Sequence, residues 1–199
     1  NIEKVKTINL SIDFTPPKSR LKVIGLADGN IISAKTKLQL VAEENLLSIG
    51  KTYYKIDNGT RLASADGNIP ITQLQDGNHH LEYFTEDNTN GRESVQFFDF
   101  YLDKNSPIVI TDVLGDRFIV NEKIYFSGRT KLKFTAVDNK SGVEDIFYSL
   151  DGKAFTKYSD PFYMPTKAGV YAIRYYAFDK MGNQGAGNPN KKIEEYKHN

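Results

Sequence analysis

Few residues of this chain have the types and the spacing that enzyme chemistry requires. Ser48–Lys51 matches the SxxK pattern of some acyl-transfer enzymes, but the companion motifs are missing and the match precedes a predicted strand, not a helix. No GxSxG, HExxH or phosphate-loop motif is present. His79 and His80 are adjacent, so on a strand they point to opposite faces and cannot easily share a metal. We therefore expect structural or surface roles for these histidines and no enzyme activity.

Carboxylates give a second possible chemistry, the binding of a hard cation. Calcium takes 6–8 oxygen ligands, usually from several carboxylates. The Asp-Gly pairs at Asp28, Asp66, Asp76 and Asp151 are isolated from other acids, so we interpret them as turns. The densest remaining acidic group predicts a weak metal site, and we expect no other cofactor. The members of this group are Asp138, Glu144 and Asp145, with Asp179 as a further member.

Four tyrosines lie outside the predicted core register or in predicted loops. These are Tyr53, Tyr158, Tyr163 and Tyr176. Exposed planar rings can stack on sugars or anchor a protein partner. The alternative interpretation is that they pack at a domain junction or cover a sheet edge.

The composition excludes several classes of partner. The 199 residues include 26 Lys and Arg against 25 Asp and Glu, so no basic surface for nucleic acid is expected. No apolar run reaches the ~18 residues of a membrane-spanning helix. Cysteine is absent, which removes disulfides, thiol nucleophiles and Cys-based zinc sites. The chain begins without Met or a secretory signal, so we expect a mature or trimmed fragment.

The elements that must position these side chains are short strands. Apolar and polar residues alternate in segments such as 37–42 and 131–137, which is the period of a half-buried strand. Turn sequences separate these segments, and no window shows convincing 3.6-residue periodicity. The pattern predicts an all-β protein built from β-sandwiches.

The chain contains one unit twice. Residues 37–40 align with 131–134, and with the same offset Tyr54 meets Tyr148 and Asp57 meets Asp151. This similarity over about 90 residues predicts two tandem immunoglobulin-like β-sandwich domains, at 13–103 and 104–199. Residues 1–12 form an extra strand, either the end of a preceding repeat or the first strand of domain one.

Turn chemistry explains much of the patterning in both copies. Asp151-Gly152 fits a type I′ turn, because glycine adopts positive φ without strain. Asp and Asn side chains hydrogen-bond nearby backbone in such turns. The residues expected to form structural turns are Asp57, Gly59, Asp151, Gly152, Asp179, Gly182 and Asn183.

One stretch resembles a known family. SGV…FYSLDGKAF…Y…PFYMPTKAGVYAIRYYAFDKMGN, within residues 131–183, is similar to the bacterial immunoglobulin-like tandem repeat of the OmpL47 type. Residues 37–91 carry an eroded form, with Leu47-Ser48 in place of Ser141-Gly142. The resemblance implies an immunoglobulin-like sandwich on a bacterial surface or in the periplasm. It implies no activity, since these repeats usually act as spacers or binding modules.

Together these observations predict a non-catalytic tandem segment of a larger exported bacterial protein. Its role would be spacing, presentation or protein–protein interaction, with a protein or a cell-surface glycan as the partner. The alternative is a carbohydrate-binding accessory module of a surface glycan-processing or adhesion protein. An enzyme whose site the motifs miss is the remaining alternative.

Overall fold

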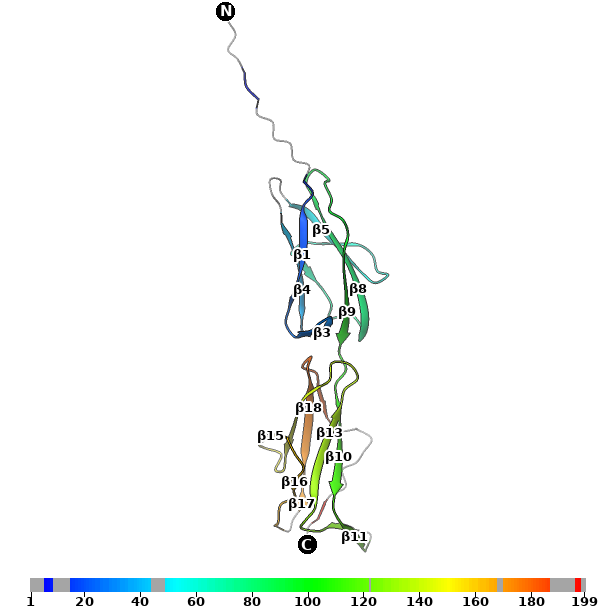
Figure 1. Cartoon of the computed structure of the whole chain (residues 1–199), viewed down its shortest axis with the longest axis vertical. Helices are drawn as coiled ribbons and strands as arrows, with labels where there is room; N and C mark the ends of the chain where they lie inside the picture. Colours follow the sequence, from blue (N-terminus) through cyan, green and yellow to red (C-terminus); the bar gives the residue numbers. More distant parts are fainter. Residues whose placement is uncertain are drawn as a thin grey trace, which may run out of the picture. The chain divides into compact units, whose positions relative to one another are not determined.

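The computed structural model of this protein is all-β. It describes residues 6–8, 15–43, 49–121, 123–167, 170–186 and 196–197, and every regular element in those ranges is a strand (Figure 1). No helix within these ranges is long and apolar enough to cross a membrane. The all-β sandwich fold expected from the short alternating segments is therefore confirmed.

The chain divides into two compact units. Unit 1 comprises residues 1–25, 36–73 and 78–100, and unit 2 comprises residues 26–35, 74–77 and 101–199. The predicted boundary after residue 103 lies close to the change of unit after Phe100. Of the predicted extra strand at 1–12, Lys6–Ile8 is exposed and outside any strand, and the other residues lie outside the described part of the chain.

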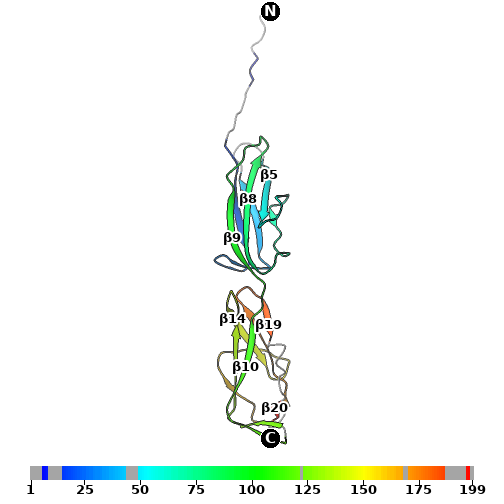
Figure 2. The ribbon, with the colours of Figure 1, turned by 90° about the vertical axis from the view of Figure 1, so that its right-hand side faces the viewer.

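Unit 1 is built from two sheets. One has the order β1-β4-β7, and the other contributes β9, β8, β5 and β6 in that order; Figure 2 shows β9, β8 and β5 side by side. The strands are β1 (Lys18–Ile24), β4 (Lys37–Glu43), β5 (Ile49–Ile56), β6 (Leu62–Ser64), β7 (Asn68–Ile69), β8 (Gly77–Asp87) and β9 (Gln96–Asp103).

Alternation along these strands places the core of unit 1 between the two sheets. Leu38 and Leu40 of β4, and Leu81, Tyr83 and Thr85 of β8, are buried at alternate positions, because successive side chains of a strand point to opposite faces. The buried apolar residues of unit 1 are Leu38, Leu40, Tyr54, Ile69, Ile71, Leu81, Tyr83, Phe84 and Phe100.

Unit 2 contains the second sandwich and a short hairpin from earlier in the chain. Its sheets have the orders β10-β13-β16 and β15-β14-β18-β19, with the smaller pairs β11-β12 and β17-β20. In the hairpin, β2 (Ala27–Asp28) pairs with β3 (Ile31–Ser33), and β3 runs parallel to residues Tyr101–Asp103 of β9. The other strands are β10 (Ile108–Leu114), β11 (Arg117–Val120), β12 (Lys123–Phe126), β13 (Lys131–Val137), β14 (Val143–Ser149), β15 (Thr156–Lys157), β16 (Phe162–Tyr163), β17 (Val170–Tyr171), β18 (Arg174–Asp179), β19 (Gln184–Ala186) and β20 (Tyr196–Lys197).

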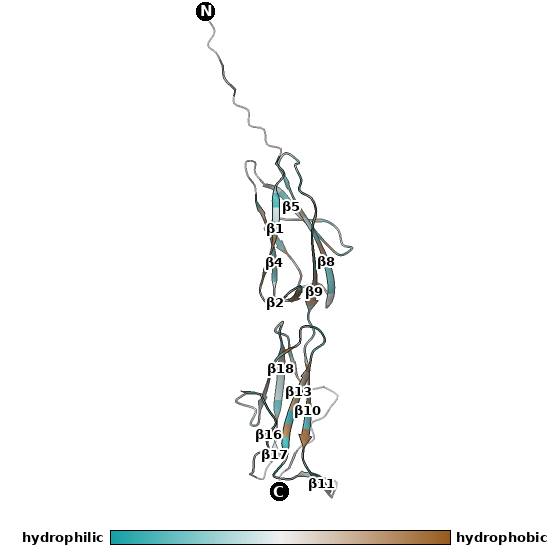
Figure 3. Ribbon diagram, in the orientation of Figure 1, coloured by the Kyte–Doolittle hydropathy of each residue, from teal (hydrophilic) through white to brown (hydrophobic). Residues whose placement is uncertain are grey.

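The core of unit 2 follows the predicted register. Ile146, Tyr148 and Leu150 pack against this core, as do Tyr171 and Tyr175 from the later strands. Hydrophilic and hydrophobic residues alternate along β13, so one face of that strand enters the core (Figure 3). The buried members are Val109, Leu132, Phe134, Met164, Ile173 and Ala177.

The chain turns or bends at the three expected segments, and one expected turn type is wrong. At Asp179–Asn183, Gly182 has φ 77° and the Asn183 amide donates to Asp179 Oδ1 at 2.8 Å. In the β5–β6 turn the residue with positive φ is Asp57 (52°), and Gly59 instead donates its amide to the Ile56 carbonyl at 2.9 Å.

The predicted type I′ turn at Asp151-Gly152 is wrong. Gly152 has φ 73°, but Asp151 is not in the positive region that this turn type also requires. The Asp151 carboxylate instead accepts the amides of Lys153 and Ala154, which fixes a longer loop between β14 and β15.

The two units repeat one backbone arrangement. Gly25 in unit 1 has φ +133°, and a Cβ there would lie 3.0 Å from the Thr36 Cα. Gly115 in unit 2 has φ +141°, and a Cβ there would lie 3.1 Å from the Thr130 Cα. The facing tyrosines also recur, because Tyr54 pairs with Tyr83 and Tyr148 pairs with Tyr175. The repeat seen in the sequence is therefore a repeat in three dimensions.

Candidate binding surfaces and a candidate cation centre

Four aromatic side chains gather on the outer face of the β14–β18 sheet in unit 2. We call this the outer aromatic face and define it as Phe147, Phe155, Tyr176 and Phe178. Phe147 pairs with Tyr176 across the two strands, and their rings are 5.3 Å apart and 25° from parallel. The neighbouring residues Ile146, Tyr148, Tyr175 and Ala177 occupy the core, so these rings must project to the other side.

The rings of the outer aromatic face are tilted against one another. Phe178 meets both Phe147 and Tyr176 at 78°, and Phe155 meets Tyr176 at 51° with centroids 5.0 Å apart. Phe155 is 41% exposed, and Phe147, Tyr176 and Phe178 are half-buried. The result is an uneven apolar surface, not a single flat platform.

One ion pair lies at the border of this surface. Lys157, opposite Phe147 on β15, contacts Asp145 with an Nζ to Oδ1 distance of 2.5 Å. The hydrogen bond and the charge of Asp145 raise the pKa of Lys157. The border of the outer aromatic face is therefore charged, with both signs present.

The corresponding face of unit 1 is covered. Tyr53 pairs with Phe84 across β5 and β8, with ring centroids 5.2 Å apart. The guanidinium carbon of Arg92 lies 3.7 Å from the centre of the Phe84 ring, and that of Arg61 lies 5.0 Å from it. Phe84 is only 3% exposed, and Tyr53 is half-buried.

The four tyrosines singled out in the sequence have different surroundings. Tyr176 belongs to the outer aromatic face and Tyr53 packs on Phe84. Tyr163 is 59% exposed, with the Lys131 ammonium 4.7 Å from the centre of its ring. The expectation that Tyr158 is an exposed aromatic is wrong, because its ring packs edge-on against buried Phe134 at 5.2 Å.

Three carboxylates converge in unit 2. Asp103 ends β9, Asp138 follows β13 and Asp179 ends β18, and one oxygen of each lies within 4.8 Å of the other two. Asp103 is 0% exposed, Asp179 is 2% exposed and Asp138 is half-buried. We call this group the carboxylate centre.

Two of the four predicted metal-binding residues belong to the carboxylate centre. The structure brings Asp138 and Asp179 together, as the sequence predicts, but it places Glu144 on the surface and pairs Asp145 with Lys157. Sequence reasoning missed Asp103 as a partner. The available signal is the DxxxP spacing at Asp13–Pro17 and Asp103–Pro107, which places an aspartate at the start of both copies.

Neutral N–H groups supply the hydrogen bonds to the carboxylate centre. Asp138 Oδ2 accepts the amide of Gly142 at 2.9 Å, and Asp179 Oδ2 accepts Asn183 Nδ2 at 2.8 Å. Asp103 Oδ2 accepts the Ser141 amide at 3.2 Å. Burial raises the pKa of Asp103, and the charges of Asp138 and Asp179 raise it further against the opposing effect of Ser141.

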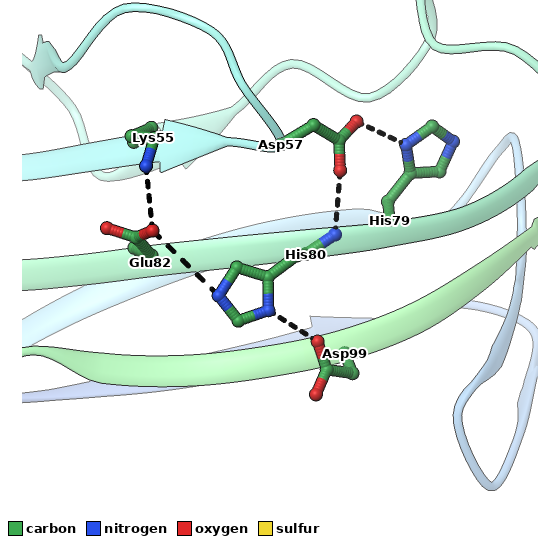
Figure 4. Close-up of polar contacts among 6 residues, drawn as sticks. All are labelled: Lys55, Asp57, His79, His80, Glu82 and Asp99. Atoms are coloured by element: carbon green, nitrogen blue, oxygen red, sulfur yellow. Dashed lines mark hydrogen bonds and ion pairs between the residues drawn. The ribbon is translucent and has the colours of Figure 1, made fainter.

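The adjacent histidines lie in separate polar contacts of unit 1 (Figure 4). His79 Nδ1 is 2.8 Å from Asp57 Oδ2, and His80 Nδ1 is 2.5 Å from Asp99 Oδ1. Their rings also contact different aromatics, Phe100 and Phe97. The prediction that the two side chains point to opposite faces of their strand is confirmed.

The Asp57 carboxylate receives two contacts at the end of β5. Burial alone would raise the pKa of Asp57, but the His79 hydrogen bond, the His80 amide and the charges of both rings together lower it. Of the SxxK match, Ser48 lies outside the described residues, and Lys51 is exposed on strand β5.

Comparison with known proteins finds a structural similarity and shows no family. No protein-family model matches the chain. No curated protein matches it either. A solved structure of fibronectin(III)-like modules of Clostridium thermocellum CbhA is similar at 13% identity, covering 90% of this chain and 93% of that chain with a TM-score of 0.43. At that identity and score the similarity carries no argument about function, and the resemblance to the OmpL47-type repeat stays a prediction.

Proposed function

We propose that this chain is a non-catalytic tandem immunoglobulin-like segment of a larger exported bacterial protein, and that unit 2 binds a protein partner through the outer aromatic face. The observation that carries this proposal is the contrast between equivalent faces of the two units. In unit 1 two arginines lie over Phe84, which is 3% exposed, whereas in unit 2 Phe155 is exposed and the other three rings are half-buried. The location outside the cytoplasm rests on the resemblance of residues 131–183 to exported repeats.

The chemistry of the face fits a protein partner better than a sugar. Aromatic side chains are enriched at the centres of protein interfaces, where a polar rim surrounds them. Rings tilted by 51° and 78° complement irregular apolar side chains, whereas a sugar stacks on one flat ring. Fully burying one such side chain is worth roughly 1.5–3 kcal/mol, so these rings supply much of a moderate binding energy.

Paired capture experiments test this proposal. The wild-type chain and a Phe155→Ser/Tyr176→Ser variant would each be used to capture proteins from the surface fraction of the source bacterium. The control variant is Phe97→Ser, which removes a ring that is 61% exposed in unit 1. We expect at least one protein to depend on Phe155 and Tyr176 and to be unaffected by the control. Equal capture by all three folded chains would contradict the proposal.

Tyr163 favours a second candidate function, carbohydrate binding. Its ring is the most exposed of the four predicted tyrosines, and Lys131 beside it could donate to a sugar hydroxyl. A glycan array with the wild-type chain and with Tyr163→Ala tests this alternative. Binding that disappears in the variant would support it, and an array without signal would argue against it.

A further inference from the structure

The carboxylate centre brings three acids together without a basic partner among the described residues. Within the described ranges, no lysine, arginine or histidine forms an ion pair with Asp103, Asp138 or Asp179. Like charges this close, in surroundings from which water is largely excluded, repel one another strongly. Buried carboxylates in proteins are normally paired with a cation or coordinate a metal.

Two buried oxygen atoms at the centre lack a hydrogen-bond partner. Asp138 Oδ1 is buried and accepts no hydrogen bond. Ser141 is 6% exposed, and its Oγ also has no hydrogen-bond partner. This hydroxyl lies close enough to the Asp103 carboxylate to lower its pKa, although the two groups do not have the geometry of a hydrogen bond. Buried oxygens without partners are rare in folded proteins, and an absent ion is one explanation for them.

The spacing and chemistry of these oxygens suit one hard divalent cation. Calcium–oxygen distances are about 2.3–2.6 Å, so two ligands of one calcium ion lie at most about 5 Å apart. The three carboxylate oxygens lie within 4.8 Å of one another. We propose that Asp103, Asp138 and Asp179 bind a calcium ion in unit 2, with the Ser141 hydroxyl as an adjoining oxygen.

A related turn in unit 1 lacks these features in its described residues. Asp87 corresponds to Asp179, and its Oδ1 accepts the Gly91 amide at 2.8 Å as Asp179 Oδ1 accepts the Asn183 amide. Asp87 Oδ1 additionally accepts the amide and the hydroxyl of Thr89, both at 2.7 Å. This oxygen is therefore satisfied by three donors, and Leu47 replaces Ser141 in the first copy. Asp87 is the matched control for the proposal.

Titration of the full chain with calcium and with terbium tests the proposal. The chain has no tryptophan, and Tyr101 lies two residues before Asp103 on β9, so a tyrosine near the site is available to sensitise bound Tb³⁺. Calorimetry in calcium chloride and terbium luminescence should both report one site. Calcium affinities of extracellular modules correspond to Kd values on the order of 10⁻⁴–10⁻³ M, and we expect a value in or below this range.

Variants of the centre and matched controls distinguish this site from weak surface binding. We expect Asp138→Asn and Asp179→Asn to weaken binding by about tenfold or more, by analogy with losses at other metal sites. Asp87→Asn, Glu144→Gln and Asp145→Asn should leave it unchanged. Asp138→Asn also removes like-charge repulsion, so without calcium it should melt no lower than wild type, and calcium should raise its melting temperature less than that of wild type.

Three outcomes would overturn the proposal. The first is the absence of calcium binding by the folded wild-type chain at millimolar concentration. The second is binding that Asp138→Asn and Asp179→Asn both retain. The third is binding that the control variants weaken equally, which would indicate diffuse attraction to surface acids.

Discussion

The two units share a backbone arrangement. They differ in the burial of their outer aromatic side chains and in the hydrogen-bond partners of their acidic turns. Tyr53 and Phe84 in unit 1 occupy the same cross-strand positions as Phe147 and Tyr176 in unit 2. In unit 1 two arginines lie over Phe84, and in unit 2 Phe155 and Phe178 extend the pair into a larger, partly exposed aromatic surface. Residues that are alike in the two units therefore maintain the common fold. Residues that differ between the units determine which surfaces are available for binding.

The acidic turns show the same contrast. Both turns close with an amide four residues later that donates to the aspartate. In unit 1 the Thr89 hydrogen bond, together with the Gly91 and Thr89 amides, lowers the pKa of Asp87 despite burial. In unit 2 burial and two neighbouring carboxylates raise the pKa of Asp103. The turn in unit 1 thus supplies its aspartate with hydrogen-bond donors from within the turn. The same turn in unit 2 lies beside two further carboxylates.

Core truncation should have the largest effect and should be similar in the two units. Leu38 and Leu132 occupy equivalent positions and are each 1% exposed. We expect Leu38→Ala and Leu132→Ala each to lower the free energy of unfolding of its own unit by about 2–5 kcal/mol, because each leaves a cavity. Urea denaturation would measure both. A large loss in one unit and none in the other would contradict a shared core.

The matched glycines provide a second test of the shared backbone. Gly25→Ala and Gly115→Ala each add a Cβ at a position of positive φ. The new Cβ would lie 3.0 Å from a threonine Cα in unit 1 and 3.1 Å from one in unit 2. We expect each to destabilise its unit by about 1–3 kcal/mol, since non-glycine residues are strained there. Thermal melting of both variants would measure this, with Gly128→Ala as a control, because a Cβ at Gly128 meets no atom within 4 Å. Unchanged melting temperatures would argue against strain at these positions.

Removing one arginine should make unit 1 resemble unit 2. Arg92→Ala uncovers the Phe84 ring, and the lost cation–π contact is worth about 0.5–2 kcal/mol. We expect a modest loss of stability in denaturant and increased binding of an apolar fluorescent dye. Lys22→Ala, at an exposed position of β1, is the control. Dye binding that stays at the wild-type level would show that Arg92 does not cover the ring.

Acid should weaken unit 1 through Asp57 by a small amount. The folded state lowers the pKa of Asp57, so its contribution is complete above the ordinary aspartate pKa of about 4. That contribution is lost as the pH falls through the lower folded-state pKa. Melting curves of wild type and Asp57→Asn between neutral and strongly acidic pH would test this. The stability difference between them should shrink in acid, and a constant difference would contradict the prediction.

Alternation and turn chemistry predict most of the fold but not the outer surfaces. The core register of β14 follows from Ile146, Tyr148 and Leu150 because side chains alternate along a strand. The same rule places Phe147 on the opposite face but cannot say whether another chain segment covers it. The position of Tyr158 was missed because it lies in a loop, where periodicity gives no register.

The carboxylate centre shows the same limit for polar groups. Asp179 and Asp138 are predictable as acids beside turns, whereas Asp103 joins them only through the packing of β9, β13 and β18 ends. Glu144 and Asp145 are nearer to Asp138 in sequence, but their strand carries them away from it. Closeness in the sequence is therefore a poor guide to the members of a site that forms where the ends of three strands meet.

Hydroxyl-radical footprinting of the intact chain tests the contrast between the two faces most directly. The account predicts that Phe155 and Tyr176 are oxidised readily and that Phe84 is protected. A captured protein partner should then protect Phe155 and Tyr176 and leave the labelling of exposed Phe97 unchanged. Equal labelling of Phe84 and Tyr176 in the free chain, or a partner that protects neither Phe155 nor Tyr176, would contradict it.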